Sequence, residues 1–340
     1  MKKILLSILG LALLVSCEKE IEFKGEQLDP KLVIGSLVEP GQPVSAYITK
    51  SYFFLDSDED TMAPDDLAAT LYVNGNRIGE MTPHYDTLYD YHNGYLPDMG
   101  IYHLVKVFTH PYCVAEGDVV KVTASANGFD DVAGESSPVP KETAWRLISV
   151  DTTSWDVYSY SYDEDEEGTL SIDAELEVVI EITDPNPGHT DYFKIEIDGS
   201  YNDFETGNTF YFLASYNDPV FENIDTDIAG GYLPTSKGLF TDLLFDGKSY
   251  QIKLPVSVWI SILRDPDPDF FHMPIKLEHV SKEYYYYLNT CEQDDELMQF
   301  FAEPVQTYSN VDGGYGLVGA HWSSSIDLPF PVQFERSLNP

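Results

Sequence analysis

The run AELEVVIEIT at residues 174–183 gives the clearest fold signal in the chain. Apolar side chains alternate with charged or polar ones along it, which is the period of a strand with one buried and one solvated face. The turn sequence DPNPG at 184–188 follows, and YFKIEID at 192–198 returns as a second alternating run. Two such runs joined by a turn predict a β-hairpin over residues 174–198.

More strands are predicted on both sides of this hairpin. Residues 144–151 begin the second half of the chain, and residues 199–238 form a long excursion rich in Asn, Asp, Gly and aromatic residues. Asp246-Gly247 predicts another hairpin turn. The strands around it are expected at 243–245, 249–254 and 256–263.

The first half of the chain is a succession of short strands. Asn74-Gly75 is the strongest local hairpin signal. Strands are predicted at 31–38, 44–52, 69–73, 77–81, 102–109 and 118–126. Short strands with turn signals at regular spacing are typical of an immunoglobulin-like or transthyretin-like β-sandwich. The stretch ESSPVPK at 135–141 predicts a domain boundary, with the β-sandwich at 31–140 and a larger β-rich domain at 141–340.

One α-helix is predicted, near residues 281–301. Ser281 is a good N-cap, and Glu283 in the first turn suits the positive end of the helix dipole. Tyr284, Leu288 and Cys291 recur at the spacing of one buried helical face. The predicted fold class is therefore mainly β, with one helix in the C-terminal region.

The N-terminal residues have the layout of a lipoprotein signal peptide. Lys2 and Lys3 precede the apolar run 4–15. As a helix this run would span about 18 Å, short of the roughly 30 Å core of a bilayer, so residues 1–16 are predicted to be a cleaved signal. The sequence LVSC at 14–17, which overlaps the end of the apolar run, resembles a bacterial lipobox. This resemblance predicts lipidation at Cys17.

Residues 17–30 are predicted to be an acidic tether. Two interpretations of the sequence EKEIE at 18–22 are left open. An acidic patch after the lipidated cysteine looks like a surface-export signal of the Bacteroidetes, and a charged run can equally be a solvated spacer.

Charge and composition exclude some classes of partner. The formal net charge is −39, and removal of Lys2 and Lys3 with the signal makes it −41. Such a surface repels phosphate backbones, so nucleic acid is excluded as a partner, whereas divalent cations would be concentrated. After lipidation of Cys17, Cys113 and Cys291 remain, and they are expected either to pair or to be buried free thiols.

The sequence predicts no enzyme. It holds no G-x-S-x-G, H-E-x-x-H or C-x-x-C, and no G-x-G-x-x-G after a predicted strand. The Asp-x-Asp-x-Asp runs at 56–60 and 265–269 lack the glycine and glutamate of an EF-hand. No metal-binding residue or cofactor is therefore predicted, although a loosely bound Ca²⁺ is left open. Carboxylate pairs for hydrolysis are left open too, because their separation cannot be read from a sequence.

Two groups of tyrosines are candidates for ligand or partner binding. Tyr158, Tyr160 and Tyr162 alternate, so they would share one face of a strand and could stack on sugar rings or anchor a protein. Tyr315 lies in the glycine-rich run NVDGGYGLVG at 310–319, which could cradle a ligand. The alternatives are structural packing for the first three residues and a tight corner for the glycine-rich run.

Several short runs, in order, carry a resemblance to a known family. They are SKEYYYYL at 281–288, FAEPV at 301–305, YSNVDGGYGLVGA at 308–320, KLVI at 31–34, the lipobox, and Asp184-Pro with Asp191-Tyr-Phe. In these runs the chain resembles a Bacteroidetes lipoprotein family catalogued as domain of unknown function 4249. The resemblance implies an outer-membrane lipoprotein, often encoded beside a TonB-dependent receptor, and it assigns no functional residue.

The leading functional hypothesis is a non-enzymatic accessory protein, lipid-anchored at the outer membrane, with its exposure on the cell surface left open. It would bind a ligand or a protein partner, together with a TonB-dependent receptor. The alternatives are a structural or adhesive surface module and a carboxylate-based hydrolase. A flat aromatic patch would favour binding, and a deep pocket with perturbed acidic pKa values would favour an enzyme.

Overall fold

The fold is mainly β, which confirms the predicted fold class. The computed structural model describes residues 29–51, 63–90, 101–160, 169–203, 206–221, 238–263, 271–291 and 307–329. Over these residues the chain forms three sheets and one α-helix, α2 (Lys282–Cys291). No helix in this part of the chain has the length and apolar character needed to cross a bilayer.

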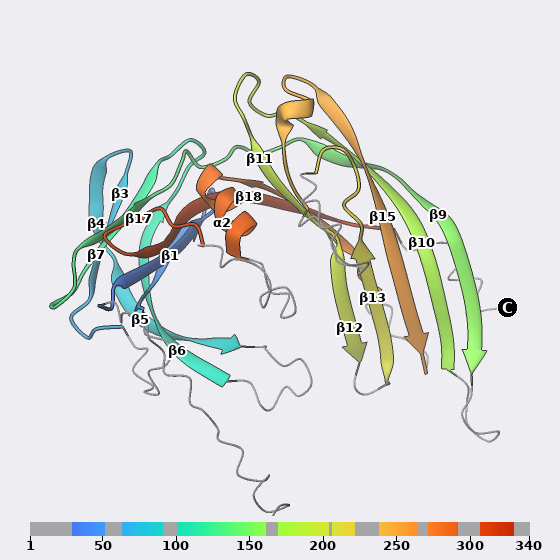
Figure 1. Ribbon diagram of the computed structural model, residues 1–340, viewed down its shortest axis with the longest axis horizontal. Helices are drawn as coiled ribbons and strands as arrows, with labels where there is room; N and C mark the ends of the chain where they lie inside the picture. Colours follow the sequence, from blue (N-terminus) through green and yellow to red (C-terminus); the bar gives the residue numbers. More distant parts are fainter. Residues whose placement is uncertain are drawn as a thin grey trace, which may run out of the picture.

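Sheet I has eight strands and runs through the middle of the molecule (Figure 1). In spatial order its strands are β14 (Leu239–Thr241), β11 (Tyr192–Glu196), β16 (Pro274–Val280), β18 (Tyr315–Asp327), β1 (Leu32–Val38), β2 (Pro43–Lys50), β6 (Ile101–Cys113) and β5 (Thr82–Asp90).

Two five-stranded sheets accompany sheet I, one at each end. Sheet II is β12 (Asp198–Asp203), β13 (Asn208–Ala214), β15 (Ser249–Ile262), β10 (Thr169–Thr183) and β9 (Trp145–Tyr160). Sheet III is β17 (Val311–Asp312), β8 (Val132–Glu135), β7 (Val120–Ser125), β3 (Ala68–Val73) and β4 (Asn76–Glu80). One large core cluster joins sheet II to β11, β14 and β16, and another joins sheet III to β1, β2 and β6.

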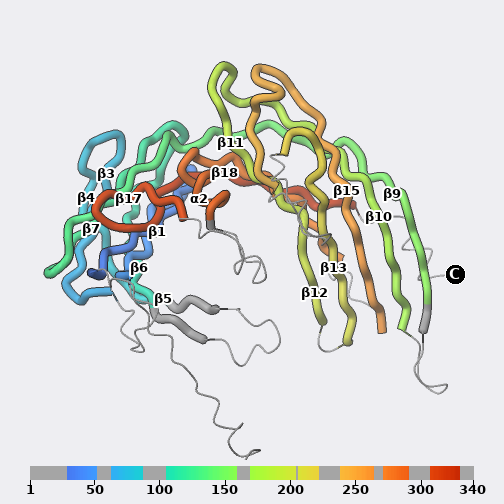
Figure 2. Tube along the Cα trace, viewed as in Figure 1, coloured from blue at the N-terminus to red at the C-terminus, as the bar shows by residue number. Residues whose placement is uncertain are grey.

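Strand β18 connects the two ends of sheet I. Its residues 315–320 run parallel to β1, and its residues 321–327 run antiparallel to β16. Figures 1 and 2 show this C-terminal strand, in red, lying along the N-terminal β1, in blue. The adjacent β17 pairs with β8 in sheet III, so residues 311–327 supply strands to both sheets of the N-terminal sandwich. A domain division at residue 140 stays a prediction.

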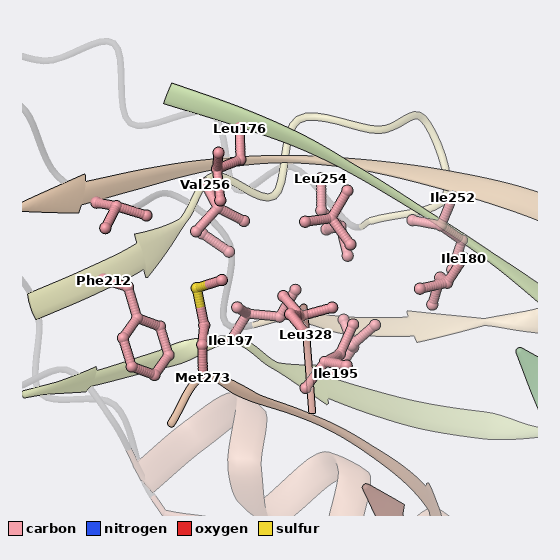
Figure 3. Packing of buried hydrophobic residues seen from close by; sticks show 14 of the residues in the cluster. Leu176, Ile180, Ile195, Ile197, Phe212, Ile252, Leu254, Val256, Met273 and Leu328 are labelled. Carbon is pink, nitrogen blue, oxygen red and sulfur yellow. The ribbon is translucent and has the colours of Figure 1, made fainter. Parts of the chain in front are cut away.

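The predicted hairpin over 174–198 is wrong, although both of its strands exist. β10 pairs with β9 and β15 in sheet II, whereas β11 pairs with β14 and β16 in sheet I. The turn after β10 therefore crosses from one sheet to the other. Figure 3 shows the result: Ile180 of β10 and Ile195 of β11 belong to one core, which lies between the two sheets. Alternation shows which face of a strand is buried, but it does not show which strand is its neighbour in the sheet. The two runs lie in different sheets, and their buried faces pack against each other.

Of the other local predictions, one hairpin is confirmed, one strand is wrong, and two predicted strands form a single strand. The Asn74-Gly75 hairpin between β3 and β4 is confirmed, with φ angles of 50° and 76° at the two turn residues. The predicted strand at 243–245 is wrong, because residues 242–244 form the 3₁₀ helix η2 and Leu243 is exposed. The predicted strands 249–254 and 256–263 are one continuous strand, β15.

Helix α2 begins where the cap predicts. The Ser281 hydroxyl accepts a hydrogen bond from the Tyr284 amide at 3.4 Å, and the same hydroxyl oxygen accepts one from the Ala320 amide of β18 at 3.1 Å. The cap therefore also attaches the helix to sheet I. The buried face differs from the prediction: Tyr285 and Leu288 are buried and Tyr284 is half-buried. Residues 292–301 of the predicted helix and the side chain of Cys291 lie outside the described residues.

A buried carboxylate in sheet I makes a pH-dependent prediction. Burial of Glu278 on β16 opposes its ionisation, but hydrogen bonds from His321 at 3.1 Å and Lys276 at 2.8 Å outweigh burial and lower its pKa to about 2. A carboxyl whose pKa is lowered on folding stabilises the fold above its unfolded pKa of 4.5, and this stabilisation is lost as the pH falls toward 2. We expect Glu278→Gln to lower the free energy of unfolding at pH 7 by up to about 3 kcal/mol. In denaturant titrations from pH 7 to pH 2.5, the difference from wild type should shrink steeply below pH 4.5 and be smallest at the acid end.

Glu80→Gln is the control for this prediction. Glu80 pairs with Arg77 at 3.3 Å, and both side chains are exposed, so the pair should contribute little. A constant difference between Glu278→Gln and wild type across the pH range would contradict the lowered pKa of Glu278.

Candidate functional site

The outer face of sheet II carries aromatic and acidic side chains side by side. Along β10, every second residue from Ile172 to Ile182 faces the core, which places the intervening acidic residues on the outer face. The strand register aligns four of the outward residues in one row across four strands, namely Asp156, Asp173, Trp259 and Tyr211. The neighbouring Tyr158 of β9 lies on the same face.

We call Tyr158, Tyr211, Trp259, Asp156, Asp173 and Glu175 the aromatic–acidic face. Its rings are substantially exposed, at 42% for Tyr158 and Tyr211 and 38% for Trp259. The Tyr158 hydroxyl donates to Asp173 at 2.8 Å, and the Ser257 hydroxyl donates to Glu175 at 2.9 Å. A hollow of about 330 Å³ lies over this row.

These groups can recognise a ligand without performing a reaction on it. Ring faces stack on flat apolar surfaces such as the C–H face of a sugar or another aromatic ring. The carboxylates accept hydrogen bonds from hydroxyl or amide donors at the edge of such a ligand. Because the polar groups of the face are mainly carboxylates, a neutral or cationic ligand suits it better than an anionic one.

A second cluster, of buried carboxylates, lies where the chain passes from sheet II to sheet I. Asp184 follows β10, Asp191 precedes β11, and Asp242 opens η2. All three are buried, and one carboxylate oxygen from each lies within 4.8 Å of the others. We call these three residues the aspartate cluster.

Backbone amides hold the aspartate cluster in place. Asp184 accepts hydrogen bonds from the amides of Asn186 at 2.7 Å and Gly247 at 2.5 Å. Asp242 accepts one from the amide of Asp191 at 3.0 Å through Oδ1. Burial is the main cause that raises the pKa of Asp242 to about 6, and the negative charges of Asp191 and Asp184 raise it further. The hydrogen bond from the Asp191 amide lowers this pKa and so offsets part of the shift.

A cavity of about 340 Å³ adjoins the cluster on the side of Asp191. His279 also lines it and places Nε2 at 3.4 Å from Asp191 Oδ1. The other ring nitrogen of His279, Nδ1, is 2.9 Å from the carbonyl oxygen of Lys141, which fixes the ring orientation. Within the described part of the chain, Asp184 and Asp242 do not line this cavity.

Comparison with known proteins places the chain in a family. The family model described as Domain of unknown function (DUF4249) matches residues 18–326. The chain belongs to the DUF4249 family. The match confirms the family that the sequence resembles. No curated protein matches the chain.

In this DUF4249 protein, Asp184-Pro and Asp191-Tyr-Phe, two of the runs on which the resemblance was based, contribute to the aspartate cluster. Asp184 and Asp191 begin these two runs, and Asp242 joins them from a distant part of the sequence. The glycine-rich run at 310–319 of this DUF4249 protein comprises β17, the tight turn at Gly313-Gly314 and the first five residues of β18. Asn310 fixes that turn through hydrogen bonds to the backbone N–H and carbonyl of Val318, at 2.9 and 2.7 Å.

The predicted binding tyrosines do not form one group. Tyr158 lies on the aromatic–acidic face, and Tyr160 belongs to the same strand but its side chain is not described. Tyr315 lies on β18 in sheet I, where the Lys31 ammonium is 5.4 Å from its ring centroid. Tyr162, Cys17 and the aspartate runs at 56–60 and 265–269 lie outside the described residues. Cys113 is a free, exposed thiol, which differs from both expectations for it.

Sequence reasoning missed Tyr211 and Trp259 of the face. Trp259 occupies an outward position in the alternating run of β15, so its exposure could have been read from the sequence. Tyr211 falls in the region interpreted as an excursion, and its place beside Trp259 depends on the register of β13 against β15.

Proposed function

We propose that this DUF4249 protein is a non-enzymatic, lipid-anchored accessory protein of the outer membrane that binds a ligand or partner together with a TonB-dependent receptor. The observation that carries the proposal is the aromatic–acidic face. Exposed Tyr and Trp side chains in one row, flanked by hydrogen-bond acceptors, are the residue types that dominate binding surfaces. The N-terminal sequence supplies the argument for an anchor at Cys17.

The lipid anchor and the binding face act together in this proposal. Anchoring confines the protein to the membrane plane, which raises its effective concentration near a receptor without a tight interface. The acidic composition is compatible with a neutral or cationic ligand.

One observation favours the hydrolase alternative. The pKa of Asp242 is raised to about 6, a value useful to a general acid, and Asp191 beside it lines a cavity. Asp242 itself is 1% exposed and does not line the cavity within the described residues, so a substrate bond would not reach it. Binding at the aromatic–acidic face is therefore the better-supported function.

Co-purification from native envelopes tests the proposal. We expect the C-terminally tagged protein to appear in the membrane fraction and to bring a TonB-dependent receptor with it in stoichiometric amount. Loss of a central aromatic residue from a binding surface costs about 2 kcal/mol, or roughly thirtyfold in affinity. The variant Trp259→Ala with Tyr211→Ala should therefore recover little or no receptor, as judged by mass spectrometry.

Tyr47→Ala is the matched control. Tyr47 is exposed to 41%, nearly the same as Tyr211, but it lies on β2 in sheet I. It should recover as much receptor as wild type. Recovery of the lipoprotein alone, at yields where known receptor pairs survive, would overturn the accessory role and favour the adhesive module. If the double variant recovered as much receptor as wild type, the aromatic–acidic face would not be part of the surface that binds the receptor.

A further inference from the structure

We propose that Asp184, Asp191 and Asp242 form a binding site for one Ca²⁺ ion. This site is separate from the aromatic–acidic face and does not depend on the proposed function. It is built at the passage between sheets II and I, where the three carboxylates come from the end of β10, the start of β11 and the start of η2.

Two carboxylate oxygens of the cluster have no hydrogen-bond partner. Asp191 Oδ2 and Asp242 Oδ2 are both buried and unpaired, in residues that are 7% and 1% exposed. A buried acceptor without a partner is unfavourable, and it is more unfavourable when it is charged. The fold provides no hydrogen-bond donor to these two oxygens. This indicates that a bound ligand takes the place of the missing donors.

The charges in the cluster point the same way. Three carboxylates face one another within 4.8 Å, and His279 beside Asp191 is the basic side chain that pairs with them among the described residues. Their other partners are neutral backbone amides. A divalent cation would offset the remaining negative charge and satisfy both unpaired oxygens at once.

The donor set selects Ca²⁺ over other common divalent ions. All three side chains offer oxygen, which suits hard cations, whereas Zn²⁺ prefers histidine nitrogen and cysteine sulfur. The carboxylates are fixed by three separate backbone segments, and Ca²⁺ tolerates irregular geometry and six to eight ligands better than Mg²⁺ does. Water from the cavity beside Asp191 can complete the coordination.

A cation at this point would tie the two sheets together. The amide of Gly247 already binds Asp184, and the amide of Asp191 binds Asp242, so the three segments are close before a metal arrives. Metal binding to a site that exists in the folded state and not in the unfolded chain stabilises the fold.

Calcium titration of the full-length protein in detergent tests the proposal. After treatment with a chelator, we expect calorimetry to give one Ca²⁺ site and thermal unfolding to show a rise in Tm of at least about 4 °C at saturating Ca²⁺. Asp242→Asn should weaken Ca²⁺ binding roughly tenfold or more and abolish the rise in Tm. Without Ca²⁺ the same variant should unfold at a higher temperature than wild type, because it removes one of three buried like charges.

Asp218→Asn is the matched control, since Asp218 is also buried but its oxygens bind Tyr250, Val220 and Lys253. It should lower Tm with and without Ca²⁺ and keep the Ca²⁺-dependent rise. An equal response to Ca²⁺ in wild type, Asp242→Asn and a second variant, Asp191→Asn, would mean diffuse screening of a very acidic surface and would overturn the site. So would the absence of any rise in wild type, or a larger rise with Mg²⁺ or Zn²⁺ than with Ca²⁺.

Discussion

Replacing Gly316 by alanine is expected to lower the free energy of unfolding by about 4 kcal/mol, which is a large fraction of the stability of a typical domain. Gly316 has φ of +113°, a conformation that costs a residue with a side chain about 1–3 kcal/mol. A Cβ atom there would also overlap the carbonyl oxygen of Ile34, its register partner on β1. Relieving this overlap requires β1 and β18 to move apart, which costs a further 1–3 kcal/mol or so. Denaturant unfolding followed by circular dichroism measures the loss.

Gly35→Ala is the matched control in the same pair of strands. Gly35 lies next to Ile34 on β1, and a Cβ added there would meet nothing closer than 3.9 Å. We expect this variant to stay within about 1 kcal/mol of wild type. If Gly316→Ala were as stable as Gly35→Ala, the close parallel pairing of β18 with β1 would be wrong.

The same strand shows what a sequence can predict about this fold. The chain marks most of its strands by alternation and marks its turns by Asn74-Gly75 and similar pairs, because these features depend on neighbouring residues. The pairing of β1 with β18 joins opposite ends of the chain, and no local pattern records it. The hairpin over 174–198 failed for this reason: two correct strands were assigned to each other when each pairs with strands elsewhere.

The candidate sites also contain features that a local sequence pattern predicts and features that depend on strand pairing. Tyr158 could be placed on an exposed strand face because its neighbours alternate. Its association with Trp259 and Tyr211 needs the register of three strands. The aspartate cluster was harder to predict, since Asp242 only precedes a segment expected to be a strand, and its other two members stand beside a turn where aspartate is ordinary. Its significance comes from burial and unpaired oxygens, which a sequence does not show.

Replacing Phe193 by alanine is expected to lower the free energy of unfolding by about 4 kcal/mol. Phe193 lies on β11 and is fully buried between sheets I and II. Its ring centroid is 5.2 Å from that of Phe240, in a stacked arrangement, and 4.8 Å from that of His279. Alanine would leave a cavity at the meeting of several aromatic rings, and strands fixed in a sheet cannot collapse to fill it. Urea unfolding monitored by tryptophan fluorescence gives the difference.

Tyr211→Ala is the control, because it shows what the loss of an exposed aromatic ring costs compared with the loss of a buried one. It also removes an aromatic ring, but from the solvated face of sheet II, so it should cost less than about 1 kcal/mol. A loss for Phe193→Ala as small as that for Tyr211→Ala would contradict a shared core between the two sheets. The expected contrast therefore tests the crossing of the chain after β10, because Phe193 can pack under sheet II only if β11 belongs to the opposite sheet.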